Sequence, residues 1–233
     1  MAFRKKADSI LTHKPDILIV PECECPDKLK FNKDTLIPSD ILWQGSNPNK
    51  GIGIFSYSHY RFTLLDIHNP DLKNILPIAV TGGQFDFTLF AIWANNPNDA
   101  EGQYITQIWK AIHCYDHLLT DSKTVLMGDF NSNTIWDKPR RKGNHTAVVG
   151  KLEQKKIFST YHKYFDQIQG KEIDPTLFLY RHPDKPYHLD YCFASVDMIE
   201  KLTKVEVGKY QDWIHLSDHL PVMITFDLND SQT

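Results

Sequence analysis

Four short polar clusters mark this sequence, and each lies next to a run of residues typical of a buried strand. They are Pro21-Glu22, Gly128-Asp129-Phe130-Asn131, His188-Leu189-Asp190-Tyr191 and Ser217-Asp218-His219. A carboxylate at the end of a buried strand is costly unless it is solvated, paired or bound to a cation. We therefore expect a folded sheet to gather these clusters in one cleft.

The rest of the chain predicts a mixed α/β protein. Helices are expected from Phe3 to Leu11, from about Asp99, as N-cap, to Leu119, and from Ala147 to Lys156. Strands are expected at 17–20, 51–57, 62–67, 76–80, 85–93, 124–127, 177–181, 188–193, 203–207 and 222–226. The chain has 233 residues, of which 41% are apolar, and it shows no repeat or long linker. A single domain over residues 1–233 is therefore predicted.

Composition excludes some classes and leaves others open. The net charge of −3 gives no sign of a nucleic-acid-binding protein, although a local basic patch would not show in this number. The four cysteines lack zinc-site spacing and are expected to be reduced thiols. No apolar run is long enough to span a membrane, and no signal peptide precedes Arg4-Lys5-Lys6. We expect a cytoplasmic protein without membrane insertion.

Each polar cluster has an ordinary explanation when taken alone. Glu22 could be a solvated carboxylate, Gly-Asp-Phe-Asn a turn, Asp190 the partner of an arginine, and Ser-Asp-His a turn before a strand. Taken together, the clusters supply carboxylates, an amide and an imidazole in a fixed order, each beside a strand. These are the groups that metal-assisted hydrolysis needs, so the set favours an enzyme.

The same segments resemble the endonuclease–exonuclease–phosphatase (DNase-I-like) superfamily. Residues 15–22 are similar to its "PDIxxxQE" segment, with Pro21 in place of the usual glutamine. Residues 128–131 match "GDFN", 188–191 resemble "xIDY", and 217–219 match "SDH". Trp93-Ala94-Asn95-Asn96 lies where the family often has Tyr-x-Pro-Asn. The resemblance covers about residues 4 to 226. It implies a four-layer α/β/β/α sandwich of two mainly antiparallel or mixed sheets covered by helices.

The resemblance also implies roles for the clustered residues. Glu22 would bind a divalent cation, Mg²⁺ or alternatively Mn²⁺, with Asp218 beside it. Asp129 would deprotonate the attacking water, and Asn131 would donate to the phosphate or to the nucleophile. Asp190 would fix the tautomer of His219, which would stabilise charge on a phosphate oxygen.

Three further residues are predicted to contact the substrate: Trp93, His145 and Arg181. For Trp93 the alternative is plain packing, and for His145 it is a solvated loop. The run Lys138, Arg140, Arg141 and Lys142 is the only local cluster in the sequence suited to a phosphate backbone, unless it is just a solvated loop.

One departure from the family concerns the start of the chain. Members begin with a core strand that ends in an Asn, whereas here only three residues precede the first expected helix. We hypothesise that Met1 is an internal methionine with about ten further residues upstream. Without that strand, activity could be weak, and the open sheet edge could pair with another chain. Otherwise a monomer is expected.

Three functions remain open at this point. The first is a metal-dependent nuclease or phosphodiesterase that cleaves by water attack at phosphorus, with DNA as a candidate substrate. The second is a phosphatase acting on a small or lipid-linked phosphoester, because one fold can serve both. The third is an inactive scaffold, suggested only by the missing strand.

Overall fold

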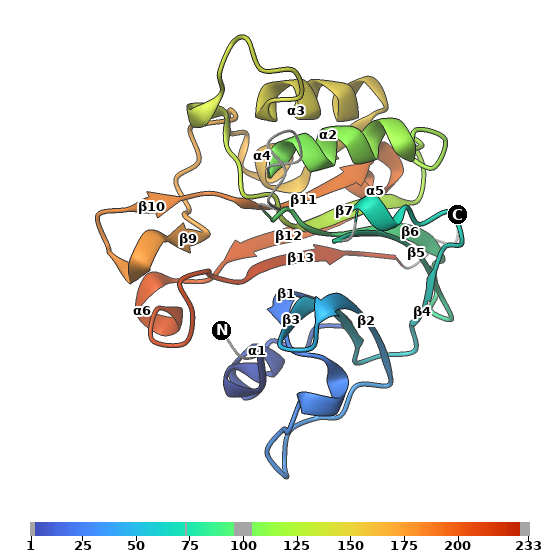
Figure 1. Ribbon diagram of the computed structural model, residues 1–233, viewed down its shortest axis with the longest axis vertical. Helices are drawn as coiled ribbons and strands as arrows, with labels where there is room; N and C mark the ends of the chain where they lie inside the picture. The colour runs from blue at the N-terminus through green and yellow to red at the C-terminus, as the bar shows by residue number, and fades with distance from the viewer. Residues whose placement is uncertain (1–2, 73, 96–103, 229–233) are drawn as a thin grey trace.

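The computed structural model describes residues 3–72, 74–95 and 104–228, and its elements stack in four layers (Figure 1). A six-stranded sheet lies at the centre, in the order β4-β5-β6-β7-β11-β8. Its strands are β4 (Arg61–Leu64), β5 (Ile75–Thr81), β6 (Phe87–Trp93), β7 (Thr124–Asp129), β11 (Asp190–Ser195) and β8 (Ile157–Ser159). Only β6 and β7 run parallel to each other. This parallel pair, followed by antiparallel β11, brings the end of β7 between Trp93 and Asp190.

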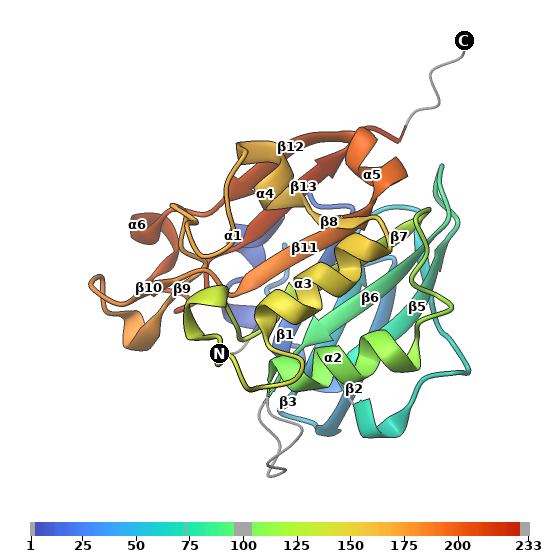
Figure 2. The same cartoon turned by 90° about the horizontal axis from the view of Figure 1, so that it is seen from above.

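Two helices cover one face of this sheet (Figures 1 and 2). They are α2 (Ile105–Cys114) and α3 (His145–Gln154). Ile108 and Ile112 recur at helical spacing on α2 and pack with Phe90 and Leu126 of the sheet. The expected helix extended to Leu119, but α2 ends at Cys114, and the expected cap Asp99 lies outside the described residues. Leu119 is nevertheless buried, because the turns after α2 return it to the same core.

The opposite face packs against a second β layer. This layer contains a three-stranded sheet, β1 (Ile17–Cys23), β3 (Lys50–Ser56) and β2 (Asp40–Asn47), and a pair, β12 (Leu202–Val207) and β13 (Val222–Phe226). Ile52 and Ile54 of β3 meet Leu89 and Ala91 of β6 in the core between the layers. Among the described residues, β1 pairs only with β3 and β13 only with β12. The layer is therefore divided into two sheets, and the expected upstream strand stays a prediction.

The fourth layer is formed by the first residues of the described chain, below β1 and β3 in Figure 1. Phe3 of η1 (Phe3–Lys5) and Ala7 of α1 (Ala7–Leu11) pack on Val20 and Phe55. Trp213 of α6 (Tyr210–Trp213) closes the same cluster. Three apolar clusters thus separate four layers, which confirms the expected α/β/β/α sandwich.

Several elements were not predicted or differ from the prediction. Strands β2 and β8 and helices α4 (Thr160–Phe165), α5 (Val196–Glu200) and α6 were not predicted from the sequence. The expected strand at 177–181 is wrong beyond β9 (Leu177–Phe178), because residues Leu179–Arg181 form the 3-10 turn η5. Tyr180 and Arg181 in this turn have φ angles of 57° and 60°, which a strand excludes. Strand β10 (Pro186–Tyr187) returns antiparallel to β9. The remaining 3-10 turns are η2 (Pro26–Lys28), η3 (Pro70–Leu72) and η4 (Thr134–Trp136).

Two expectations from composition concern the state of the cysteines and membrane-spanning helices. The four cysteines are free thiols in the structure. Within the described part of the chain, every helix is too short or too polar to cross a membrane.

The backbone geometry at position 128 explains why the polar cluster at the end of β7 begins with a glycine. Its φ is 144°, and a Cβ atom there would lie 1.9 Å from the carbonyl oxygen of Ile92 on the neighbouring strand. A side chain would force β6 and β7 apart at the position next to Asp129. The glycine is therefore a steric requirement of this strand pair.

We expect Gly128→Ala to lower the free energy of unfolding by about 3 kcal/mol, because the backbone strain and the overlap with Ile92 add. Urea unfolding followed by circular dichroism measures this. Gly150→Ala is the matched control, since nothing lies within 4 Å of a Cβ at Gly150 in α3. This control should gain roughly 0.5–1 kcal/mol from helix propensity. Equal midpoints for the two variants would contradict the steric explanation.

Candidate active site

The centre of the candidate site is a pair of carboxylates on neighbouring strands. Asp129, the last residue of β7, lies directly opposite Asp190, the first residue of β11. Asp129 is 4% exposed and the Asp190 side chain 17% exposed. Like charges directly opposite each other are unfavourable in an antiparallel pair. Neighbouring groups must therefore compensate the two charges.

Asn131 provides part of this compensation from the loop after β7. Its backbone N–H donates to Asp129 Oδ1 at 2.8 Å, and its side-chain amide donates to Asp129 Oδ2 at 2.7 Å. The same amide donates to the carbonyl oxygen of Ala94 at 2.7 Å. Asn131 has a φ of 46°, a left-handed conformation that Asn tolerates better than most residues. The Asn thus fixes both oxygens of Asp129 in one orientation.

His219 provides the second compensation. Its Nδ1 is 2.9 Å from Asp190 Oδ2, so Nδ1–H donates to the carboxylate. A bridge between Leu177 and His219 places the 217–219 loop beside β9, and Thr176 binds the backbone of Asp190 and Leu220 from the same side. The His219 side chain is 34% exposed. Because Nδ1 is engaged, the other ring nitrogen is the one available to a substrate.

The two carboxylates and the imidazole shift each other's protonation. Burial, together with the charge of Asp190, raises the pKa of Asp129 to about 8, although His219 acts in the opposite direction. Burial alone would lower the pKa of His219, but the charges of Asp190, Asp129 and Asp218 raise it to about 10. At neutral pH this cluster therefore contains a protonated imidazole and one carboxyl group able to take or release a proton.

A divalent cation fits the chemistry of this region. One ligand atom from each of Asp129, Asp190 and His219 lies within 4.8 Å of the others. Two further carboxylates, Glu22 and Asp218, lie close enough for their charges to act on the same centre. Carboxylate oxygens are ligands that suit a hard divalent cation, and this region brings several of them together.

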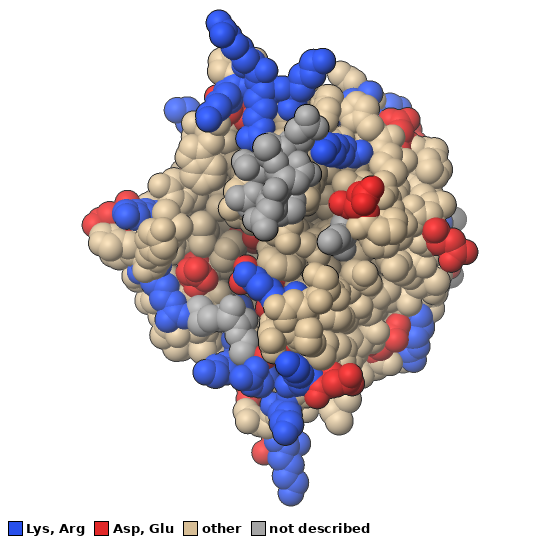
Figure 3. All heavy atoms as spheres, in the orientation of Figure 1, with Lys and Arg blue, Asp and Glu red and all other residues tan. Residues whose placement is uncertain are grey.

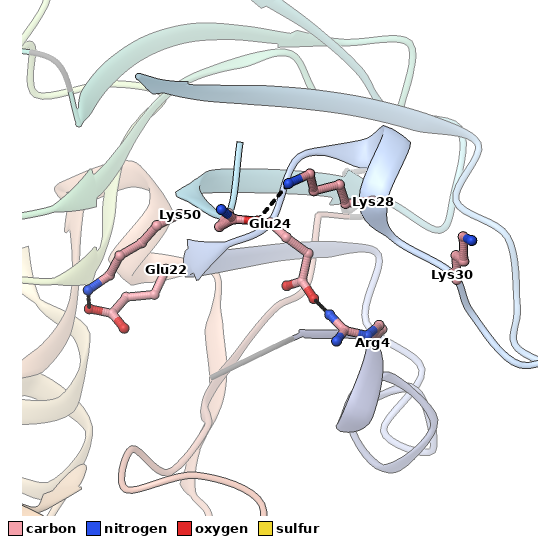
Figure 4. A pocket seen from close by; sticks show the side chains of 7 residues that line it. Arg4, Glu22, Glu24, Lys28, Lys30 and Lys50 are labelled. Atoms are coloured by element: carbon pink, nitrogen blue, oxygen red, sulfur yellow. Dashed lines mark hydrogen bonds and ion pairs between the residues drawn. The ribbon is translucent and has the colours of Figure 1, made fainter. Parts of the chain in front are cut away.

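Glu22 belongs to a bulge in β1. The register against β3 shifts between Pro21 and Cys23, and Glu22 has a φ of 58°. A bulge turns a side chain out of the regular alternation, and strain of this kind is often found at functional sites. In the structure Glu22 forms an ion pair of 2.7 Å with Lys50, the first residue of β3 (Figure 4). Its carboxylate therefore has a cationic partner within the protein.

Two lysines of the site were not predicted from the sequence. Lys6 donates to Ser217 Oγ at 3.3 Å, and the charges of Asp218, Glu22 and Asp190 act on it. Burial is the larger effect and lowers the pKa of Lys6. Lys50 lies 5.4 Å from the centre of the Trp93 ring. Both lysines come from segments distant from the acidic residues in sequence, so local motifs could not identify them.

The three predicted substrate contacts lie in different environments. Trp93 is 6% exposed and packs in the core between the sheets, so its face is not free for stacking. Arg181 is exposed on the η5 turn. His145 is fully buried in α3, where its ring nitrogens meet Ser132 Oγ at 2.8 Å and Gln169 Oε1 at 3.2 Å. The structure thus places Trp93 and His145 inside the protein and Arg181 on its surface.

Comparison with solved structures identifies the fold. An AP endonuclease from Archaeoglobus fulgidus matches with a TM-score of 0.66 and 19% identity over 97% of this chain and 96% of its own. The 3′ phosphatase NExo from Neisseria, bound to a product DNA hairpin, matches with a TM-score of 0.65 and 19% identity over 97% and 94%. An endonuclease/exonuclease/phosphatase family protein from Leptotrichia buccalis matches with a TM-score of 0.58 and 16% identity over 97% and 92%. The chain has the fold of the endonuclease/exonuclease/phosphatase, DNase-I-like proteins.

Comparison of the sequence alone gives no match. No protein-family model matches the sequence, and a search of the curated proteins gives no significant match.

We expect acid to destabilise the protein through His145. Burial lowers the pKa of His145 from 6.5 to about 4, although its hydrogen bond with Gln169 acts in the opposite direction. The unfolded chain therefore binds a proton that the folded chain excludes. The stabilisation is complete above pH 6.5 and falls by about 3 kcal/mol as the pH drops to 4.

The measurement is the urea midpoint of wild type and His145→Gln between pH 7 and pH 4. The variant should be less stable at pH 7 and show a flatter pH dependence. His182→Gln, whose side chain is 54% exposed, is the control and should follow the wild-type curve. Parallel curves for wild type and His145→Gln would contradict this role.

Proposed function

We propose that this protein is a divalent-metal-dependent phosphoester hydrolase, and more specifically a nuclease or phosphodiesterase that cleaves by attack of water at phosphorus. The observation that supports it most is the joint placement of Asp129, Asp190 and His219 at one edge of the central sheet. A carboxylate fixed by Asn131 and an imidazole fixed by Asp190 are the two proton-handling groups that such a reaction needs.

We assign the cation to Glu22 and Asp218, with Mg²⁺ preferred and Mn²⁺ as an alternative. This assignment leaves Asp129 and His219 free to act on water and phosphate, since their own contacts are already made within the cluster. The bound cation would supply charge stabilisation on the phosphate oxygens. Lys50 would have to release Glu22, because the two now form an ion pair.

Asp129 acts as the base in this proposal. Its raised pKa of about 8 makes it a good proton acceptor near neutral pH. The oxygen of water forms a bond to phosphorus, its proton passes to Asp129, and the bond from phosphorus to the leaving oxygen breaks. Asn131 keeps the carboxylate in place during this transfer.

His219 acts on the phosphate. Asp190 holds Nδ1–H, so the protonated ring presents Nε2–H to an oxygen on which negative charge develops. The pKa of about 10 keeps the ring cationic at neutral pH. Asp190 is a positioning residue here, since it acts through the imidazole.

The proposal that the substrate is a nucleic acid is supported by the surroundings of the site. The solved structures of similar fold include an AP endonuclease and a phosphatase bound to a DNA hairpin. Trp136 is 46% exposed, and its ring lies beside that of Tyr187. Tyr187 belongs to the segment that leads into Asp190. Tyr180, on the exposed η5 turn, is 81% exposed. Aromatic side chains in such positions can stack on bases. A cytoplasmic location and a monomeric state stay predictions.

Asp129→Asn and His219→Ala should each reduce hydrolysis at least about 100-fold, since each removes a proton-handling group. The assay measures Mg²⁺-dependent cleavage, with EDTA controls, of an abasic-site duplex, plain duplex, single-stranded DNA, a phosphate monoester and bis(p-nitrophenyl) phosphate. Asp121→Asn is the matched control. Asp121 is exposed and lies just before the first residue of β7, whereas Asp129 is the last residue of this strand. Full activity in either site variant would refute these roles.

The outcomes of the assay separate the alternatives. Cleavage of the small esters alone would indicate a phosphatase on a small or lipid-linked phosphoester. The cation assignment can be tested by a measurement that does not depend on hydrolysis. Calorimetry should show weaker Mn²⁺ binding for Glu22→Gln, whereas His219→Ala should bind Mn²⁺ as the wild type does. No cation binding and no hydrolysis would favour an inactive scaffold.

We expect a bell-shaped dependence of kcat/KM on pH. Activity should rise up to about pH 8, where Asp129 loses its proton, and fall above about pH 10, where His219 loses its own. A bound cation stabilises the Asp129 carboxylate, so higher Mg²⁺ should move the rising limb to lower pH. A rate independent of pH between 6 and 10 would contradict the assignment of base and acid.

A further inference from the structure

A pocket of about 510 Å³ lies next to the candidate site (Figure 4). Three segments that are distant in sequence form it: the η1 turn, the end of β1 with η2, and the hairpin between β2 and β3. Its volume is within the range of roughly 300–1,000 Å³ typical of ligand sites. In the sequence, the run from Lys138 to Lys142 was the only local cluster suited to a phosphate backbone. The pocket brings further cations together from segments that lie apart in the sequence.

The pocket has an excess of positive charge. Four of its lining residues are cations, Arg4, Lys28, Lys30 and Lys50, against the two carboxylates Glu22 and Glu24. Arg4 is paired with Glu24 and Lys50 with Glu22. Two lysines therefore carry the excess charge.

Of the four cations that line the pocket, Lys28 and Lys30 form no ion pair with a carboxylate of the described residues. Lys28 Nζ donates to the neutral side-chain oxygen of Asn49 at 2.7 Å. Both lysines are exposed, and in Figure 4 they lie on the segment that follows β1. A hydrogen bond to an amide orients an ammonium group but leaves its charge available to an anion.

Glu22 connects this pocket to the candidate site. Its side chain lines the pocket, and its charge acts on Asp129. Lys50, the ion-pair partner of Glu22, lies over Trp93, whose neighbour across the sheet is Asp129. The ion pair of Glu22 and Lys50 therefore lies both at the wall of the pocket and beside the candidate site.

The charge on this face of the molecule suits an extended polyanion. Lys and Arg side chains gather at two places in Figure 3, over the loop that precedes α3 and over the segment that follows β1. The loop that precedes α3 carries the exposed residues Lys138, Arg140, Arg141 and Lys142, and the segment that follows β1 carries the exposed pocket lysines Lys28 and Lys30. A single small phosphoester would engage only one of these groups. A nucleic-acid strand, with a phosphate at every residue, can engage both.

We infer that this pocket binds the phosphodiester group of a nucleic-acid strand that neighbours the one being hydrolysed, with Lys28 and Lys30 as its contacts. The inference rests on the proposed function and deepens it, because it makes a strand with several phosphates the preferred substrate. Binding at the neighbouring phosphate holds the scissile one against Asp129 and His219.

The test combines a double variant with a modified substrate. Lys28→Gln/Lys30→Gln is compared with Lys33→Gln, an exposed lysine of the same segment that does not line the pocket. The DNA probe is whichever duplex or single strand the wild type cleaves. Its phosphates on either side of the cleaved bond are replaced, one at a time, by neutral methylphosphonates. The small probe is bis(p-nitrophenyl) phosphate, which has no second phosphate.

The double variant should raise KM for the DNA probe roughly tenfold, as expected for loss of charge-assisted contacts, and leave kcat/KM for the small ester within twofold. One methylphosphonate should cause the same loss in wild type and no further loss in the double variant. An unchanged KM, or equal losses on both probes, would overturn the inference. The inference would also be overturned if the methylphosphonate raised KM in the double variant by the same factor as in the wild type.

A binding measurement separates this inference from the proposed function. If no substrate is hydrolysed, the proposed function fails. Fluorescence anisotropy of a labelled 20-residue duplex in EDTA then still tests the pocket. The double variant should bind less tightly and show a slope of log affinity against log salt that is smaller by about 1 to 2 units. Identical binding and slope would overturn the inference.

Discussion

The site depends on one unfavourable arrangement, the placement of Asp129 directly across from Asp190 on β7 and β11. Two carboxylates in these positions repel each other, and burial of Asp129 increases the cost. Hydrogen bonds from neighbouring residues offset this cost. Asn131 donates to Asp129, and His219 donates to Asp190. The same contacts give each group a defined orientation and a shifted pKa. The reactivity proposed here and the stability of the sheet edge therefore have a common cause.

The sequence predicted those parts of the structure that depend on local patterns. Aliphatic runs such as Ile17–Val20 identified strands, because a strand buried on both faces has few polar residues. The order of the layers followed from the family resemblance. The meeting of Asp129, Asp190 and His219 followed from the position of their clusters next to predicted strands. Strand β2 was missed because its sequence, with Gln44 and Gly45, lacks a regular alternation.

Features that depend on distant contacts could not be predicted from the sequence. His145 lies in a polar stretch, and its burial results from Ser132 and Gln169, which approach it only in the folded protein. The basic pocket is assembled from three segments, so no window of the sequence contains it. The ion pair of Glu22 with Lys50 arises from a bulge and a hairpin that lie side by side. In each case tertiary packing decides the environment of a titratable group.

The divided second layer gives the two halves of the site different mechanical support. Strands β7 and β11 are interior strands of the six-stranded sheet, and they carry Asp129 and Asp190. Strand β1 has a neighbour on one side in the described structure, and it carries Glu22 at its bulge. Displacing an edge strand breaks fewer hydrogen bonds than displacing a central one. Among the described strands, Glu22 is thus held at the edge of a sheet, whereas Asp129 and Asp190 are held on interior strands, and a movement of Glu22 is expected to break fewer strand hydrogen bonds.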